Sequence, residues 1–99
     1  MITGAQCRAA RALSELSLET LARLAKIDAD VIDAFESKLS EPDAETISLL
    51  ETTLEAAGVV FLPENGAGAG VRLKFNRSET RRIAILEGEG GIVGNDDVP

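Results

Sequence analysis

Four polar residues in the first 57 positions stand where the N-caps of helices are expected, and they constrain the fold more than any other feature. Each precedes a segment whose apolar residues recur at intervals of three or four, as the buried side of a helix requires. A side-chain oxygen at an N-cap accepts a hydrogen bond from a backbone N–H of the first turn, so such residues mark where helices begin. The four predicted caps are Thr3, Ser17, Asp28 and Asp43.

These caps predict four helices, with a turn at positions 40–43 before the last one. Gly58 is expected to end the fourth helix, because glycine is favoured just past a helix C-terminus. We therefore predict a mainly α fold with a four-helix domain over residues 1–58. The residues expected to point inward are Gln6, Ala9, Ala10 and Leu13, then Leu21, Ala22, Leu24 and Ala25, then Val31 or Ile32 with Phe35, and finally Ile47, Leu50, Leu54 and Ala57.

The sequence changes character after Gly58, where two strand-like segments follow. Val59–Leu62 is a short apolar run, and Val71–Phe75 alternates apolar and basic residues with period two, which is typical of a half-buried strand. The glycine-rich connection at 63–70 predicts a β-hairpin over residues 59–75. A single hairpin is marginally stable in water, so this one needs either the helical core or a second copy of itself.

We expect the second copy, and hence a homodimer formed through the hairpin with two-fold symmetry. The residues expected at this contact are Val59, Phe61, Val71, Leu73 and Phe75. Residues 76–99 form a separate extension that becomes rich in glycine and acidic residues, and we predict a flexible, partly disordered tail. Within the extension, positions 81–86 fit either a third strand or a helical turn.

Composition excludes several kinds of chemistry. The chain has no histidine, which removes the commonest general base and the commonest zinc ligand, and its single cysteine, Cys7, has no partner for an internal disulfide. We therefore predict a protein with no catalytic residues, no metal, no cofactor and no small-molecule substrate. No apolar run approaches the ~20 residues that span a bilayer, so we expect a cytoplasmic protein without membrane contact.

A set of residues spread over positions 5–57 matches a known pattern. It comprises Arg-Ala-Ala-Arg-Ala-Leu at 8–13, Leu16-Ser17, Glu19-Thr20-Leu21-Ala22, and then Ala25, Ile27, Ile32, Glu36 and Pro42. In this spacing the chain resembles the Cro/C1 (Xre) helix-turn-helix family, in the variant whose fourth helix is followed by a hairpin with a Pro-Glu-Asn-Gly loop. The resemblance implies a bacterial-type transcriptional regulator, and it implies a structural ion pair between Arg11 and Glu36.

The third helix departs from this family at the positions where DNA is read. By resemblance, the start of the third helix would contact bases and the start of the second would contact phosphates, through donors such as Gln, Ser, Arg or Asn. Here the second helix starts with Leu18, and positions 28–36 hold four acidic residues and no basic one. These acids would meet phosphates of like charge. The predicted recognition or partner-binding residues are Leu18, Asp28, Ala29, Asp30, Val31, Asp33 and Ala34.

Charge is unevenly distributed along this chain, whose formal net charge is −7. Positions 71–82 hold five basic residues and one acidic residue. They form either a solvated strand edge that discourages aggregation or a basic patch that meets DNA, a partner protein or a second subunit. The possible phosphate contacts are Arg8, Lys38, Arg72, Lys74 and Arg77.

Two functions therefore remain open for this chain. The first is a non-enzymatic transcriptional regulator that binds a basic regulatory protein through its acidic third helix and acts as an antagonist or antiactivator. The alternative is a dimeric, sequence-specific repressor that binds duplex DNA. The resemblance to the family favours the repressor, whereas the acidic third helix favours the protein-binding regulator, which is the function we expect.

Overall fold

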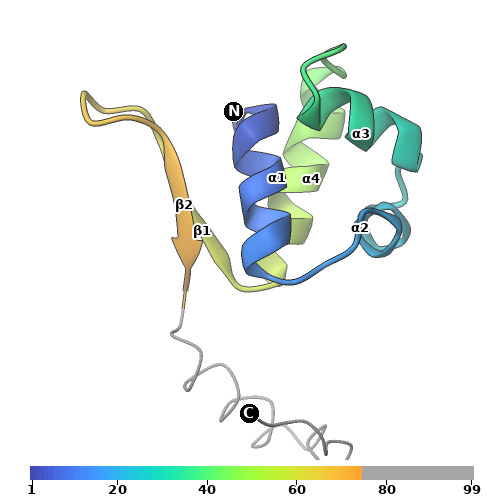
Figure 1. Cartoon of the computed structure of the whole chain (residues 1–99), viewed down its shortest axis with the longest axis horizontal. Coiled ribbons are helices and arrows are strands. Elements are labelled where there is room, and N and C mark those ends of the chain that lie inside the picture. Colours follow the sequence, from blue (N-terminus) through green and yellow to red (C-terminus); the bar gives the residue numbers. More distant parts are fainter. Residues whose placement is uncertain (75–99) are drawn as a thin grey trace, which may run out of the picture.

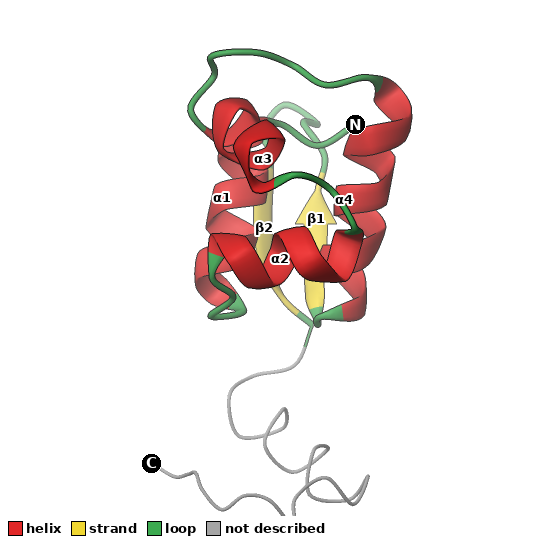
Figure 2. Ribbon diagram, turned by 90° about the vertical axis from the view of Figure 1, so that its right-hand side faces the viewer, coloured by secondary structure: helices red, strands yellow, loops and turns green. Residues whose placement is uncertain are grey.

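A layer of two helices separates a β-hairpin from the other two helices. The computed structural model describes residues 1–74. In Figures 1 and 2, α1 and α4 form the middle layer, the hairpin lies on one side of them, and α2 and α3 lie on the other. The predicted order of four helices followed by a hairpin is therefore confirmed. The elements are α1 (Gly4–Leu13), α2 (Leu18–Ala25), α3 (Ala29–Glu36), α4 (Ala44–Ala56), β1 (Val59–Leu62) and β2 (Gly70–Leu73).

Some of the sequence predictions fall beyond this range. Phe75, Arg77 and the extension 76–99, with its positions 81–86, lie outside the described residues. Within residues 1–74, no helix is long and apolar enough to cross a membrane.

All four predicted N-caps are confirmed. The Thr3 hydroxyl accepts a hydrogen bond from the Gln6 N–H (3.1 Å), and the Gln6 side-chain oxygen accepts one from the Thr3 N–H (2.9 Å), which makes a reciprocal capping box. Each of the other caps accepts from an N–H of the first turn: Ser17 from Thr20, Asp28 from Asp30, and Asp43 from Thr46. Each helix start is therefore determined by residues close to it in the sequence.

The hydrophobic core is aliphatic apart from Phe35, the single aromatic residue among the buried hydrophobic residues of positions 1–74. Of the two alternatives in the third helix, Ile32 is the buried residue, whereas Val31 is 37% exposed. Gly58 follows α4 with a φ of +104°, in the left-handed region that favours glycine, and the chain then turns into β1. The buried hydrophobic residues are Ile2, Cys7, Ala10, Leu21, Ala25, Ile32, Phe35, Ile47, Leu50, Leu54 and Val59.

Four residues that were expected to point inward are exposed, so those predictions are wrong: Ala9, Leu13, Leu24 and Ala57. In α1 the buried residues are Gly4, Gln6, Cys7 and Ala10, because α3, α4 and the hairpin each cover a different side of this helix and leave Ala9 and Leu13 uncovered. In α2 the contacts with α3 and α4 reach Leu21 and Ala25 but leave Leu24 53% exposed. The helical period limits the inward candidates to one side, and only the neighbouring elements decide which of them are covered.

The hairpin is antiparallel, and its pairs run from Val59 with Leu73 to Leu62 with Gly70. The second strand therefore begins one residue earlier than predicted and ends at Leu73. The reason is that Gly70, which has no side chain to show a strand pattern, takes part in the pairing with Leu62. Beyond the strand, the Lys74 N–H donates to the Gly58 carbonyl (2.7 Å), which closes the base of the hairpin.

The apolar side of the hairpin faces the protein's own helices. Val59 is buried, and Phe61, Val71 and Leu73 are half-buried against the core. Of the two alternatives for covering the hairpin, the helical core is therefore present on this side, because α1 and α4 contact the strands. The homodimer itself stays a prediction.

One buried side chain attaches the hairpin to α1. The Gln6 side-chain nitrogen donates to the carbonyl oxygens of Leu62 (3.2 Å) and Gly70 (2.9 Å), the pair nearest the hairpin tip. The same amide caps α1 through its oxygen, and only 7% of Gln6 is exposed. Gln6 thus satisfies its own buried polar groups by joining a helix start to a strand pair more than 50 residues away.

A close backbone contact joins the start of α1 to the end of α3. A Cβ atom placed on Gly4 would overlap the carbonyl oxygen of Phe35 and would lie 3.3 Å from the Cα of Glu36. Glycine is therefore required at this position by the approach of two backbones, and not by its own dihedral angles.

Gly4→Ala is expected to destabilise the fold by about 1–3 kcal/mol, since the added methyl group forces α1 and α3 apart. This direction is opposite to the usual effect, because alanine inside a helix is favoured over glycine by about 1 kcal/mol. Urea unfolding followed by circular dichroism measures the change, and an unchanged or higher stability would contradict the close contact.

Gln6→Leu is expected to loosen the hairpin while leaving the helical core intact, because both carbonyl oxygens lose a donor at a cost of about 1–3 kcal/mol. The measurement is amide hydrogen exchange, with faster exchange in the β1–β2 ladder and unchanged exchange at Leu50. Thr3→Ala is the control, because it weakens the same helix cap but keeps the Gln6 donor. Equal loosening in both variants would show that the cap, and not the contact with the hairpin, is responsible.

Candidate functional site

The second and third helices form one exposed side of the molecule (Figure 2). The chain leaves α2 at Lys26, whose φ of 59° is left-handed, and the Ile27 N–H donates back to the Ala22 carbonyl (3.1 Å). Asp28 then caps α3, so only three residues separate the two helices. This tight turn holds α3 across the front of the helical layer with its outer side uncovered by any described segment.

The outer side of α3 is acidic. Asp28, Asp30 and Asp33 are exposed, and Val31 between them is 37% exposed. We call these four residues the α3 acidic surface. The bond from the Asp30 N–H to the Asp28 carboxylate (3.1 Å) accounts for one acid as a helix cap. Asp30 lies in the first turn of α3, where a negative charge also interacts favourably with the helix dipole. Asp33 has neither of these roles in the helix.

The other predicted recognition residues are less accessible. Ala29 and Ala34 are half-buried, and Leu18 is half-buried because it packs against the hydrophobic core. The structure thus places the aspartates and Val31 outward, and it assigns Leu18 mainly to packing between the second helix and the core.

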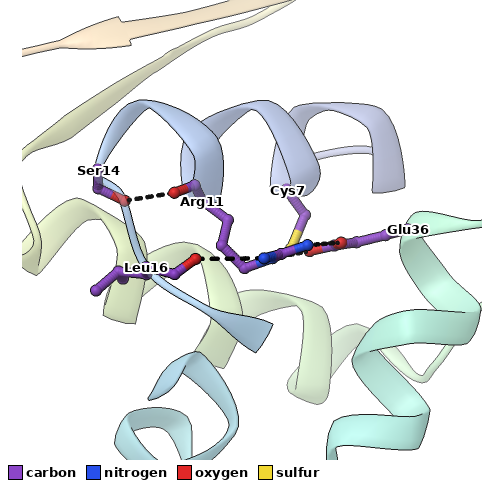
Figure 3. Close-up of polar contacts among 5 residues, drawn as sticks. All are labelled: Cys7, Arg11, Ser14, Leu16 and Glu36. Carbon is purple, nitrogen blue, oxygen red and sulfur yellow. Dashed lines mark hydrogen bonds and ion pairs between the residues drawn. The ribbon is translucent and has the colours of Figure 1, made fainter. Parts of the chain in front are cut away.

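The inner side of α3 is anchored by a buried carboxylate (Figure 3). The Arg11 guanidinium donates to both oxygens of Glu36, from Nε at 3.0 Å and from its terminal nitrogen at 2.8 Å. The side chain of Glu36 is 3% exposed and that of Arg11 is 21% exposed. The ion pair expected between these residues is therefore present, in the bidentate form that is favoured for arginine and a carboxylate.

Two further contacts complete this cluster. The Cys7 thiol donates to Glu36 (3.4 Å), and another Arg11 nitrogen donates to the Leu16 carbonyl at the start of the connection to α2 (3.2 Å). Hydrogen bonding to Glu36 raises the pKa of Arg11 further above its ordinary value. Burial, with the neighbouring carboxylate of Glu36, raises the pKa of Cys7 to about 12. The thiol is therefore protonated at neutral pH and is a hydrogen-bond donor in the core, not a nucleophile.

The expected phosphate contacts do not gather on one surface. Lys38 is exposed just past α3, and its φ of 63° is left-handed. Arg72 belongs to the hairpin, which lies on the opposite side of α1 and α4 from α3, and its guanidinium donates to the Leu73 carbonyl (3.1 Å). Arg8 is exposed on α1, and Lys74 is exposed at the hairpin base. A single duplex that lies against α3 therefore does not meet the hairpin cations of the same molecule.

Residues 1–74 contain no group of three or more cysteine or acidic side chains arranged to hold a metal ion. A search of family models and of curated protein sequences finds no match to this chain. A proposal for its function therefore rests on the geometry of the exposed and buried residues.

Sequence reasoning missed two contributions to this site. The Thr3-x-x-Gln6 spacing is the capping-box pattern and predicts the local half of the Gln6 contacts. Its bonds to the hairpin join positions distant in the sequence and have no local signal. The sequence shows only that Cys7 has no disulfide partner, and its bond to Glu36 depends on how α1 and α3 cross.

The raised pKa of Cys7 predicts a loss of stability at alkaline pH. The folded protein keeps the thiol proton up to about pH 12, whereas the unfolded chain loses it near its ordinary value of 9.0. Stability from this group is therefore complete below pH 9 and declines above it, by up to roughly 1.4 kcal/mol per pH unit. Cys7→Ala is expected to lack this decline in urea unfolding measured from pH 8 upward. Identical pH slopes for both proteins would contradict the burial of a protonated thiol.

Proposed function

We propose that this chain is a small, non-enzymatic transcriptional regulator of the Cro/C1 (Xre) helix-turn-helix type that acts by binding another protein. The observation that carries the proposal is the α3 acidic surface. Three exposed aspartates lie on the helix that would read DNA in such a regulator, and no basic residue lies between positions 28 and 36.

The charge of this surface opposes contact with nucleic acid. Non-specific affinity for DNA arises from cations that displace the counterions of the phosphates, and carboxylates reverse this contribution. A single acid in a groove can accept a hydrogen bond from cytosine. Here Asp28, Asp30 and Asp33 are all exposed on one helix. The helix start favours acids at the first two positions, but these acids supply no donor for bases or phosphates. The same charges attract a basic protein surface.

The partner is therefore a protein with a basic surface. The DNA-binding face of an activator is such a surface, and a chain that blocks it acts as an antagonist. Val31 adds a small apolar contact at the centre of the aspartates, and apolar centres with polar rims are typical of protein interfaces. A chain bound in this way would occupy the activator in place of DNA.

The alternative is a dimeric, sequence-specific repressor of the same family. The observation that favours it is the pair of exposed lysines at the two ends of the third helix, Lys26 before it and Lys38 after it. These lysines would supply phosphate contacts, but the helix between them offers no basic side chain for bases. The two functions make opposite predictions for changes of charge.

Asp30→Lys/Asp33→Lys is expected to abolish binding to the partner, because both exposed acids are replaced by cations. The tagged wild-type chain and this variant are used as baits in the native cell. A protein that is retained only by the wild-type chain is then purified, together with the DNA site that it binds. The wild-type chain should displace that protein from its DNA, as measured by fluorescence anisotropy of the labelled duplex. Glu55→Lys, an exposed acid at the end of α4, is the control and should behave as wild type.

The same anisotropy measurement tests the repressor directly. Titration of the wild-type chain into labelled duplex DNA at low salt should show no binding. Binding that falls steeply with salt, and that Lys38→Ala weakens, would instead establish the repressor and overturn the protein-directed function.

A further inference from the structure

The basic residues that follow the hairpin have no role in the proposed function. Positions 77–86 contain three arginines and one acid, and they end in the apolar run Ile83-Ala84-Ile85-Leu86. Positions 87–99 contain four acids and no cation. We call residues 77–86, which follow the described part of the chain, the basic segment. Its arginines are Arg77, Arg81 and Arg82.

The α3 acidic surface offers such a segment both charge and apolar contact. Among residues 1–74, the carboxylates of Asp30 and Asp33 form no ion pair. Val31 is 37% exposed between them, and the neighbouring chain adds Leu24 on α2, 53% exposed, and Leu39 just after α3, 79% exposed. Carboxylates around exposed apolar side chains complement a segment in which arginines precede an apolar run.

The basic segment begins close enough to reach this surface. It follows Lys74 at the hairpin base, which lies at the same end of the helical layer as the connection from α1 to α2 (Figures 1 and 2). Arg81 and Leu86 come 7 and 12 positions after Lys74. An extended chain spans at most ~3.3–3.6 Å per residue, so these residues reach roughly 24 and 40 Å from Lys74. The longest dimension of the described structure is 40 Å, so a segment that passes α2 can lie along α3.

We propose that the basic segment lies on the α3 acidic surface of the same chain, with its arginines against the aspartates and its apolar run against Val31. The consequence for regulation rests on the proposed function: a partner with a basic surface must displace this segment before it binds. The chain thus covers its binding surface with the same chemistry that this surface recognises in the partner.

Covalent attachment makes a weak contact sufficient. Exposed ion pairs are individually weak, but a short connection gives an effective concentration on the order of 1 mM. A contact with a dissociation constant of about 1 mM then covers α3 for about half of the time, and the apparent affinity for a partner falls about twofold. Salt screens these charges and is expected to release the segment.

Paramagnetic broadening of amide signals in the full chain tests the contact without partner or DNA. Cys7 is 0% exposed, so a thiol introduced just after the segment by Gly88→Cys is labelled selectively with a nitroxide. The label should broaden the amide signals of Asp30, Val31 and Asp33 more strongly than those of the hairpin. Arg81→Glu/Arg82→Glu should abolish this difference, and added salt should reduce it.

A charge exchange tests where the segment lies. Asp30→Lys/Asp33→Lys should also abolish the broadening on α3, and its combination with Arg81→Glu/Arg82→Glu should restore it in part, because the exchanged charges attract each other again. Glu41→Lys/Glu45→Lys is the matched control: both acids are exposed at the start of α4, and positions 39–57 likewise contain no cation. This control, combined with the arginine exchange, should restore nothing. Thermal unfolding checks that each variant folds.

Three results would overturn the proposal: broadening that is uniform over residues 1–74, broadening that is strongest outside α3, or broadening that the arginine exchange leaves unchanged. A mixture of labelled chains with unlabelled, isotopically enriched chains detects contact between copies. Broadening of α3 in that mixture would show exchange between copies and overturn the contact within one chain. None of these measurements involves a partner or DNA, so a chain that keeps the contact but binds duplex DNA would overturn the proposed function alone.

Discussion

The buried carboxylate of Glu36 is the interaction on which the arrangement of the helices depends. Its side chain is 3% exposed, and the bidentate contact with Arg11 satisfies both of its oxygens in the core. A buried charge of this kind is destabilising by about 3–5 kcal/mol when its partner is removed. The buried side of α3 consists of Ile32, Phe35 and Glu36, so the helix contacts the core and α1 along that side. Asp30 and Asp33 lie off that side and are exposed. The buried pair therefore helps to fix the orientation of α3 that exposes the acidic surface.

The first helix transmits this constraint to the rest of the fold. On one side it meets α3 through Gly4, Cys7 and Arg11, and on another it meets the hairpin through Gln6. Each contact uses a different property: the absence of a side chain, a thiol donor, a guanidinium and an amide. A helix rich in alanine can thereby hold the two layers that lie on its opposite sides.

The distribution of charge along the sequence underlies both proposals about the α3 acidic surface. Positions 1–57 contain eleven acidic and five basic residues, whereas positions 71–82 contain five basic residues and one acidic residue. The chain enters this basic stretch in the hairpin, which lies on the opposite side of the α1 and α4 layer from α3 (Figures 1 and 2). An acidic helix attracts a basic partner and, for the same reason, the basic segment of its own chain. The attachment of the hairpin to α1 fixes the point from which that segment starts.

The sequence by itself determined where the helices begin, that α4 stops just before Gly58, and that a hairpin follows, because caps, glycines and side-chain periods act within a few residues. It also determined the charge of the third helix and, through a family resemblance, the pairing of Arg11 with Glu36. It did not determine that Ala9, Leu13 and Leu24 are exposed, or that Gln6 holds the hairpin and Gly4 admits α3. Those features were decided only by the tertiary structure, because they depend on how elements distant in the sequence cross and cover one another, and no local pattern encodes that contact.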